Sequence, residues 1–184
     1  MASNTLQGRS AAQGGFSMIE ILIAIVITAF GLLGLASFAA KATAMGVDAT
    51  QRARAAALLN DMANRVANNK GDAAAYPSTS VYGASVQVCP AAVATAAQRA
   101  ARDLCQWSNL LAGANDGGSG AAFLGYRGCV TQPVALNPVY VITVAWGSLT
   151  PGVPSADLCA QNVFGNDSLR RTIRSQVRVA NLTL

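Results

Sequence analysis

Hydrophobic and polar positions divide the first seventy residues into two stretches, both with helical character. Residues 21–40 contain no charged side chain, and a helix of that length spans roughly 30 Å, about the thickness of a hydrocarbon core. Beyond Lys41, alanine-rich sequence continues to 68–71, where Asn-Asn-Lys-Gly is a stop signal. In this second stretch apolar residues recur at steps of three and four: Ala55, Leu58, Leu59, Met62 and Val66. The pattern predicts one helix of about fifty residues, apolar all round at first and one-sided later.

The rest of the chain shows strand and turn patterns after a change in composition near residues 72–77, which marks a domain boundary. Alternation predicts a strand from Tyr82 to Val88 that ends at Cys89-Pro90. The stretch 140–146 is β-branched or aromatic and largely apolar on both faces, so we expect it at the centre of a sheet covered by the long helix.

Helical spacing predicts a helix from Ala91 to Leu111, with Trp107 as a core anchor, followed by a glycine-rich surface loop at 113–120. The expected fold class is therefore α+β. A long N-terminal helix would pack, through its second half, on an antiparallel sheet in the globular part.

A last strand is expected from Leu169 to Thr183, with apolar residues on one face and polar residues on the other. Its polar face would carry Arg170, Arg174 and Arg178 as a candidate partner-contact stripe. A solvated outer face is the simpler interpretation. If the stripe functions, it suits an acidic neighbouring subunit or phosphate.

The overall charge of +5 changes this picture little, because the 13 basic residues are scattered until the last strand. Nucleic acid is therefore possible but not the expected partner. The usual acid, base and metal roles also lack residues, since the chain has no histidine and a single glutamate. No carboxylate pair stands out among Asp103, Asp116, Asp157 and Asp167. We therefore expect that the chain is not an enzyme and binds no metal, cofactor or small-molecule substrate.

Four cysteines, Cys89, Cys105, Cys129 and Cys159, follow the apolar stretch without a C-x-x-C motif. This number and spacing favour two disulfides in an oxidising compartment over a zinc site. Three connectivities are possible. Because sequence-local loops close most readily, Cys89 with Cys105 and Cys129 with Cys159 is the favoured pairing.

The chain's only glutamate, Glu20, stands immediately before the apolar stretch, in Gly15-Phe16-Ser17-Met18-Ile19-Glu20. A secretory signal peptide cleaved near 40–44 or a plain single-pass anchor would account for the apolar residues. The stretch is longer than an ordinary signal core, however, and an anchor leaves Glu20 unexplained. The motif and the helix after it resemble the N-terminus of type IV pilins and pseudopilins.

That resemblance implies a chain in four parts: a leader at 1–15, a transmembrane and filament-core helix at 16–40, its amphipathic continuation at 41–70, and a periplasmic pilin-like domain at 72–184. Prepilin peptidase would cut after Gly15 and methylate the new amino terminus at Phe16. Glu20 would be the family's glutamate at the fifth mature position, where it could pair with a neighbouring subunit's amine. The fifteen-residue leader is longer than many in the family, and the proline of many major pilins is missing.

The function implied is that of a minor pilin that initiates or modifies pilus assembly and supports twitching motility or adhesion. It would reside in the bacterial inner membrane and then in the pilus at the cell surface. Its partners would be minor and major pilins, the inner membrane and the prepilin peptidase. Two alternatives are a minor pseudopilin of a type II secretion system and a DNA-uptake pilin.

Overall fold

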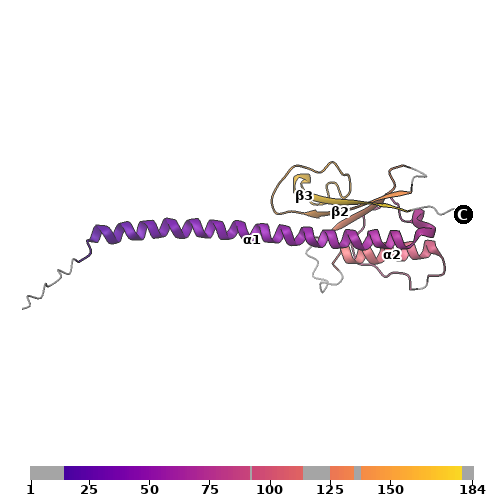
Figure 1. Cartoon of the computed structure of the whole chain (residues 1–184), viewed down its shortest axis with the longest axis horizontal. Helices are drawn as coiled ribbons and strands as arrows, with labels where there is room; N and C mark the ends of the chain where they lie inside the picture. The colour runs from indigo at the N-terminus through magenta and orange to yellow at the C-terminus, as the bar shows by residue number, and fades with distance from the viewer. Residues whose placement is uncertain (1–14, 92, 114–124, 135–137, 180–184) are drawn as a thin grey trace, which may run out of the picture. The chain divides into compact units, whose positions relative to one another are not determined.

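A computed structural model describes residues 15–91, 93–113, 125–134 and 138–179 (Figure 1). The chain divides into two compact units, Met1–Thr43 and Ala44–Leu184. The predicted leader before Gly15, most of the glycine-rich loop and the predicted end of the last strand at 180–183 lie outside the described residues.

The N-terminal unit contains the first part of helix α1, which extends from Met18 to Asn68 and has the predicted end. It continues through Gly31 and Gly34, although each glycine costs about 1 kcal/mol relative to alanine in a helix interior. Every residue from 15 to 43 is exposed. This part of α1 therefore buries no side chain against the other described residues.

A three-stranded antiparallel sheet organises the second unit. Its strands are β1 (Arg127–Thr131), β2 (Val139–Gly147) and β3 (Arg170–Arg178), in the order β1-β2-β3. The central position predicted for 140–146 is confirmed, because β2 pairs with β1 on one side and with β3 on the other. Two short 3₁₀ turns, η1 (Lys70–Ala75) and η2 (Asp167–Leu169), complete the elements.

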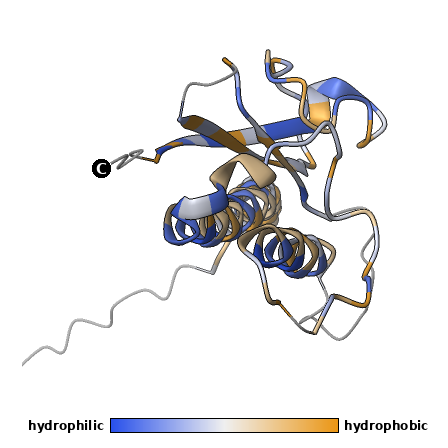
Figure 2. Cartoon of the chain, turned by 90° about the vertical axis from the view of Figure 1, so that its right-hand side faces the viewer, coloured by the Kyte–Doolittle hydropathy of each residue, from blue (hydrophilic) through white to orange (hydrophobic). Residues whose placement is uncertain are grey.

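The core lies between one face of this sheet and two helices, the second half of α1 and α2 (Ala96–Leu111). Figures 1 and 2 both show α2 beside that half of α1. The five apolar residues expected on the packed face of α1 are all buried there. Trp107 of α2 is fully buried, and its indole N–H donates to the Leu58 carbonyl at 2.9 Å. This bond joins the two helices and confirms Trp107 as a core anchor.

The predicted strand 82–88 is wrong, since only Tyr82 forms an isolated bridge, to Gly128. Gly83 directly follows with a φ of 95°, which turns the chain away from the sheet. The backbone then bonds to side chains of α2: Gly83 N–H to Ser108, and both the N–H and C=O of Gln87 to Asn109. These bonds replace the strand ladder that alternation suggested.

Two element ends also differ from prediction. Helix α2 begins at Ala96 rather than Ala91, because Thr95 forms a capping box with Gln98 that starts the helix there. Strand β3 begins at Arg170, and its bounds end at Arg178. The residue before it, Leu169, belongs to η2.

Gly128 of β1 lets the sheet approach α2 closely. A Cβ built at this position would overlap the Trp107 ring and lie 2.7 Å from Leu111 Cδ1. We therefore expect Gly128→Ala to lower the free energy of unfolding by about 1–3 kcal/mol through overpacking. Urea unfolding of the full chain in detergent micelles measures this. Gly71→Ala is the matched control, because its Cβ would meet nothing within 4 Å; an equal loss in both variants would contradict the packing argument.

Candidate functional site

The predicted processing segment lies at the start of α1. Gly15 and Phe16 precede the helix, and the Ser17 carbonyl accepts hydrogen bonds from the backbone N–H groups of Glu20 and Ile21, at 3.0 and 3.3 Å. Glu20 therefore lies in the first helical turn, where the helix dipole favours a negative charge. Within the part of the chain that the structure describes, its carboxylate has neither an ion pair nor a hydrogen bond.

Gly15 has no conformational or packing reason to be glycine in the described structure. A Cβ at this position would meet nothing within 4 Å, and its φ is not in the left-handed region. Phe16 is 80% exposed, so the aromatic ring is not part of a core. The described structure therefore gives neither residue a role in packing.

The helix after this segment is apolar on all sides. Its large apolar side chains, from Met18 to Phe38, are between half and nine-tenths exposed. The helix is long and apolar enough to cross a membrane. A continuous apolar surface of this extent needs lipid or other apolar helices around it.

The arginine stripe expected on β3 is only partly present. Arg174 and Arg178 are exposed as predicted, but Arg170 is 1% exposed and does not belong to the surface. Strand alternation placed all three arginines on one face of β3. The segment 155–164 covers that face at the start of the strand, where Arg170 lies. The stripe is therefore corrected to its two later arginines.

Arg170 instead holds the loop that precedes it. Its guanidinium makes a two-bonded contact with the Asp167 carboxylate, at 2.6 and 2.9 Å, which lowers the pKa of Asp167. Its remaining N–H groups donate to the carbonyls of Asp157, Cys159 and Ser155 at 2.7–3.1 Å. All five donors of this buried side chain are therefore satisfied. The sequence signal for this role is the carboxylate three residues earlier.

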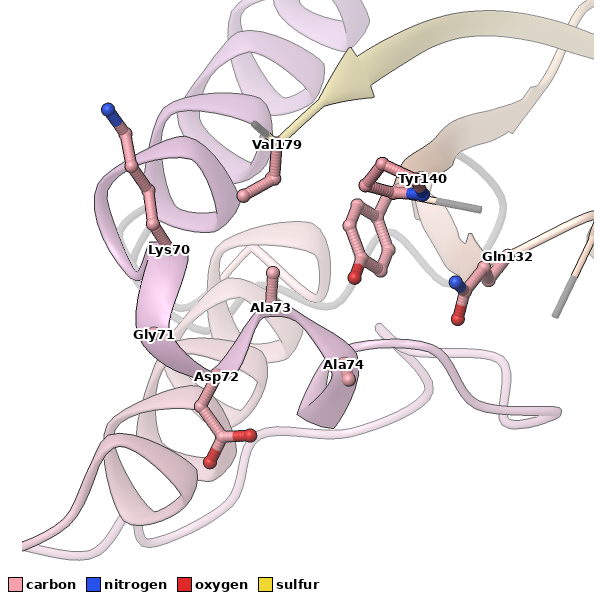
Figure 3. Close-up of a pocket in the computed structure, with 9 residues that line it drawn as sticks. Lys70, Gly71, Asp72, Ala73, Ala74, Gln132, Tyr140 and Val179 are labelled. Carbon is pink, nitrogen blue, oxygen red and sulfur yellow. The ribbon is translucent and has the colours of Figure 1, made fainter. Parts of the chain in front are cut away.

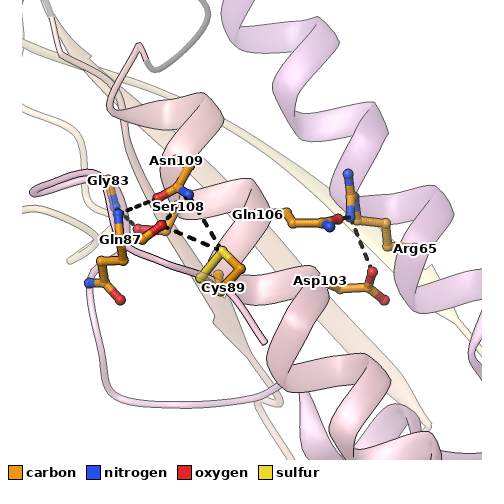
Figure 4. Close-up of a disulfide and its surroundings, with 9 residues drawn as sticks. Arg65, Gly83, Gln87, Cys89, Asp103, Gln106, Ser108 and Asn109 are labelled. Atoms are coloured by element: carbon orange, nitrogen blue, oxygen red, sulfur yellow. Dashed lines mark hydrogen bonds and ion pairs between the residues drawn. A yellow bond between two sulfur atoms is a disulfide. The ribbon is translucent and has the colours of Figure 1, made fainter. Parts of the chain in front are cut away.

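The disulfides join Cys89 to Cys105 and Cys129 to Cys159, with Cα–Cα distances of 5.6 and 5.9 Å. This is the pairing that short loop closure favours. The first ties the segment before α2 to that helix (Figure 4), and the second ties the loop held by Arg170 to β1.

A polar cluster joins α1 to α2 and η1 on the other side of the unit. The Arg65 guanidinium donates to Asp61 at 2.9 Å. It also donates to Asp103 at 3.1 Å and to Gln106 at 2.9 Å (Figure 4). The Tyr76 hydroxyl donates to the other oxygen of Asp103 at 2.6 Å. Burial and this bond to a carboxylate raise the pKa of Tyr76. The cluster holds α1, α2 and the chain after η1 together, and the hydrogen bonds of its charged groups indicate a structural role.

A hollow of about 270 Å³ lies between η1 and β2. Figure 3 shows the Tyr140 hydroxyl directed toward it, whereas the charged ends of Lys70 and Asp72 point away. No group of three histidine, cysteine or acidic side chains that could hold a metal occurs among the described residues. The hollow is therefore lined by the Tyr140 phenol, the Gln132 side chain and small or apolar residues, with no cluster of charged groups directed into it.

We expect Arg170→Met to lower the free energy of unfolding by about 3–5 kcal/mol, because it leaves three loop carbonyls without their hydrogen-bond donors. Thermal and urea unfolding of the full chain in detergent micelles measure the loss. Arg174→Met removes an exposed arginine from the same strand and should change stability by no more than about 0.5 kcal/mol. Similar effects of the two substitutions would show that Arg170 does not hold the loop.

Comparison with known families concerns the N-terminal segment. The prokaryotic N-terminal methylation motif matches residues 10–36, which include Gly15, Phe16, Glu20 and the first part of the apolar helix. No curated protein and no solved structure matches the chain. The motif and the membrane-length helix that begins within it support a type IV pilin-like protein, of the pilin or pseudopilin kind.

Proposed function

We propose that this chain is a minor type IV pilin, a subunit that initiates or modifies pilus assembly. The observation that carries the proposal is the position of the methylation motif at residues 10–36, directly at the start of a helix whose apolar side chains remain exposed. Such a segment suits a helix that is kept in the mature protein. The role is one of assembly, without a chemical reaction performed by the chain.

Processing would begin with cleavage between Gly15 and Phe16 by prepilin peptidase, which would also methylate the Phe16 amine. The exposure of both residues supports access by such an enzyme. Cleavage creates a cationic amino terminus at the edge of an apolar helix. The remaining chain would stay in the inner membrane through α1, with its globular part in the periplasm.

Glu20 would then select the correct position of the subunit within a filament. A carboxylate among packed apolar helices costs several kcal/mol unless it is paired. The Phe16 amine of a neighbouring subunit supplies a cation, and a misplaced subunit leaves both charges unpaired. The absence of a partner for Glu20 among the described residues is consistent with a partner from another chain.

Transfer from the membrane to a filament need not expose the apolar helix to water. Lipid tails and a core of packed pilin helices are about equally apolar, so extraction exchanges one apolar environment for another. Gly31 and Gly34 weaken the helix locally and allow close approach of neighbouring helices in such a core.

Among minor pilins, the chain resembles PilV. The resemblance rests on Ala101-Arg102-Asp103-Leu104 with Trp107, on the glycine-rich loop, on 140–146 and on the arginine-bearing last strand. The described structure gives these motifs structural roles, as Trp107 anchors α2 and Asp103 belongs to the polar cluster. A tip-associated role in twitching or adhesion follows from that resemblance.

The two alternatives differ in support. A minor pseudopilin of a type II secretion system shares the N-terminal motif. Deletion of the gene distinguishes the two: loss of a pilin abolishes surface pili and twitching, whereas loss of a pseudopilin abolishes exoprotein secretion. A DNA-uptake pilin rested on the basic last strand. Burial of Arg170 removes one of the strand's four arginines from the surface, which weakens that alternative.

N-terminal sequencing of the mature protein tests the processing step. We expect the sequence to begin at methylated Phe16 in cells with prepilin peptidase and at the uncut leader in cells without it. A start after Ala42 or Ala44 would identify ordinary secretory cleavage and exclude this function.

Assembly is tested separately with Glu20→Ala. Without its carboxylate, the variant should still insert in the membrane and be cleaved after Gly15, but it should enter sheared filaments poorly. Lys41→Ala is the control for loss of a charge along the same helix. Normal incorporation of the Glu20 variant would contradict the pairing with a neighbour's amine.

A further inference from the structure

The hydrogen bonds between β2 and β3 show which backbone groups of β3 are free. Val179 N–H donates to the Pro138 carbonyl at 2.9 Å, and Ser148 N–H donates to the Leu169 carbonyl at 2.7 Å. These bonds lie in register with the antiparallel pairing of the strands. Because the direction of backbone groups alternates along a strand, the odd-numbered residues of β3 bond to β2 and the even-numbered residues point to the opposite side.

The start of this outer edge is already in use. Gly152 N–H donates to the Ser168 carbonyl at 2.8 Å, and the hydroxyls of Ser155 and Thr172 lie 2.7 Å apart. Beyond Thr172, no described residue bonds to the outward backbone groups of the strand. We call the remaining part, Arg174, Gln176 and Arg178, the open edge.

The open edge carries two positive charges that have no partner among the described residues. All three of its residues are exposed, and neither arginine has an ion pair or a side-chain hydrogen bond among the described residues. Their side chains share the sheet face opposite the core, because they alternate with Ile173 and Val177, which pack against the core. The edge therefore combines three outward N–H groups, three outward carbonyls and a charge of +2.

We propose that the open edge binds an extended acidic segment of another polypeptide, which adds to the sheet as a fourth strand. Main-chain hydrogen bonds to an exposed strand give affinity in this mode of recognition, and alternate side chains give specificity. Arg174 and Arg178 lie four residues apart, roughly 14 Å along an extended strand. The partner therefore needs two acidic residues at the same spacing, on the face shared with the arginines.

A second copy of this chain fits the open edge poorly. Two such edges paired antiparallel about Gln176 would place Arg174 of one copy opposite Arg178 of the other. Like charges directly opposite each other destabilise a strand pair. The charge pattern therefore selects against self-pairing and for an acidic partner. This surface belongs to the globular unit and does not depend on leader processing.

Binding is tested with the full chain in detergent micelles and the peptide Val-Asp-Val-Thr-Val-Asp-Val, which carries the required acidic spacing. A peptide with lysine in place of both aspartates is the control. We expect saturable binding of the acidic peptide alone, together with slower hydrogen exchange at the amides of Arg174, Gln176 and Arg178. The amides of Ile173, Ser175 and Val177 should be protected before and after addition, which also reports that the sheet is folded.

Two variants separate the charge from the backbone contribution. Arg174→Glu combined with Arg178→Glu should weaken binding by about tenfold or more, since both cross-strand pairs become repulsive. Gln176→Pro removes an outward N–H that the β2 ladder does not use, as edge strands tolerate, and should also weaken binding. Arg99→Glu, an exposed arginine on α2, should leave binding unchanged.

Three results with the unaltered chain would overturn the proposal: no binding at millimolar peptide, equal binding of the lysine peptide, or binding without protection of the three outward amides. The first would show that these arginines serve only to keep other strands away from the edge, as charged edge residues commonly do. Unchanged affinity in both variants would likewise exclude this edge as the site.

Discussion

Apolar surface on every side of a helix must be covered by something other than water, and the first part of α1 presents such surface from Met18 to Phe38. The second part has a different distribution, because Ala55, Leu59, Met62 and others are buried on one face while the opposite face stays in solvent. One helix thus belongs to two environments. The sheet and α2 provide the cover for its second part, and the first part requires lipid or other helices.

Hydrophobic periodicity predicted the elements whose pattern is long and whose backbone hydrogen bonds lie within helices or the sheet. The end of α1 at Asn68 and the central position of β2 follow from such patterns. The segment 82–88 has a strand pattern too, but Gly83 turns the chain, and Asn109 of α2 satisfies the backbone of Gln87. Alternation contains no information about such long-range side-chain partners.

The same distinction applies to the candidate sites. Gly15, Phe16 and Glu20 could be proposed from the sequence because the methylation motif that includes them is linear and has a fixed spacing. Arg170 could not be separated from Arg174 by alternation, since both fall on the same face of β3. What separates them is the loop 155–164, whose carbonyls meet the guanidinium only after the chain has folded back.

The position of Arg170 after all four cysteines also affects the order in which parts of the protein can reach their final conformation. All four cysteines and the strands β1 and β2 precede Arg170. They are therefore synthesised before the guanidinium that donates hydrogen bonds to the carbonyls of the loop 155–164. Since chains emerge from the N-terminus, the Cys159 loop must wait for β3 before it reaches its final conformation. A chain truncated just before Arg170 would retain every cysteine needed for oxidation, yet it would lack the residue that fixes the loop. Oxidation state alone would therefore be an unreliable sign that this protein has matured.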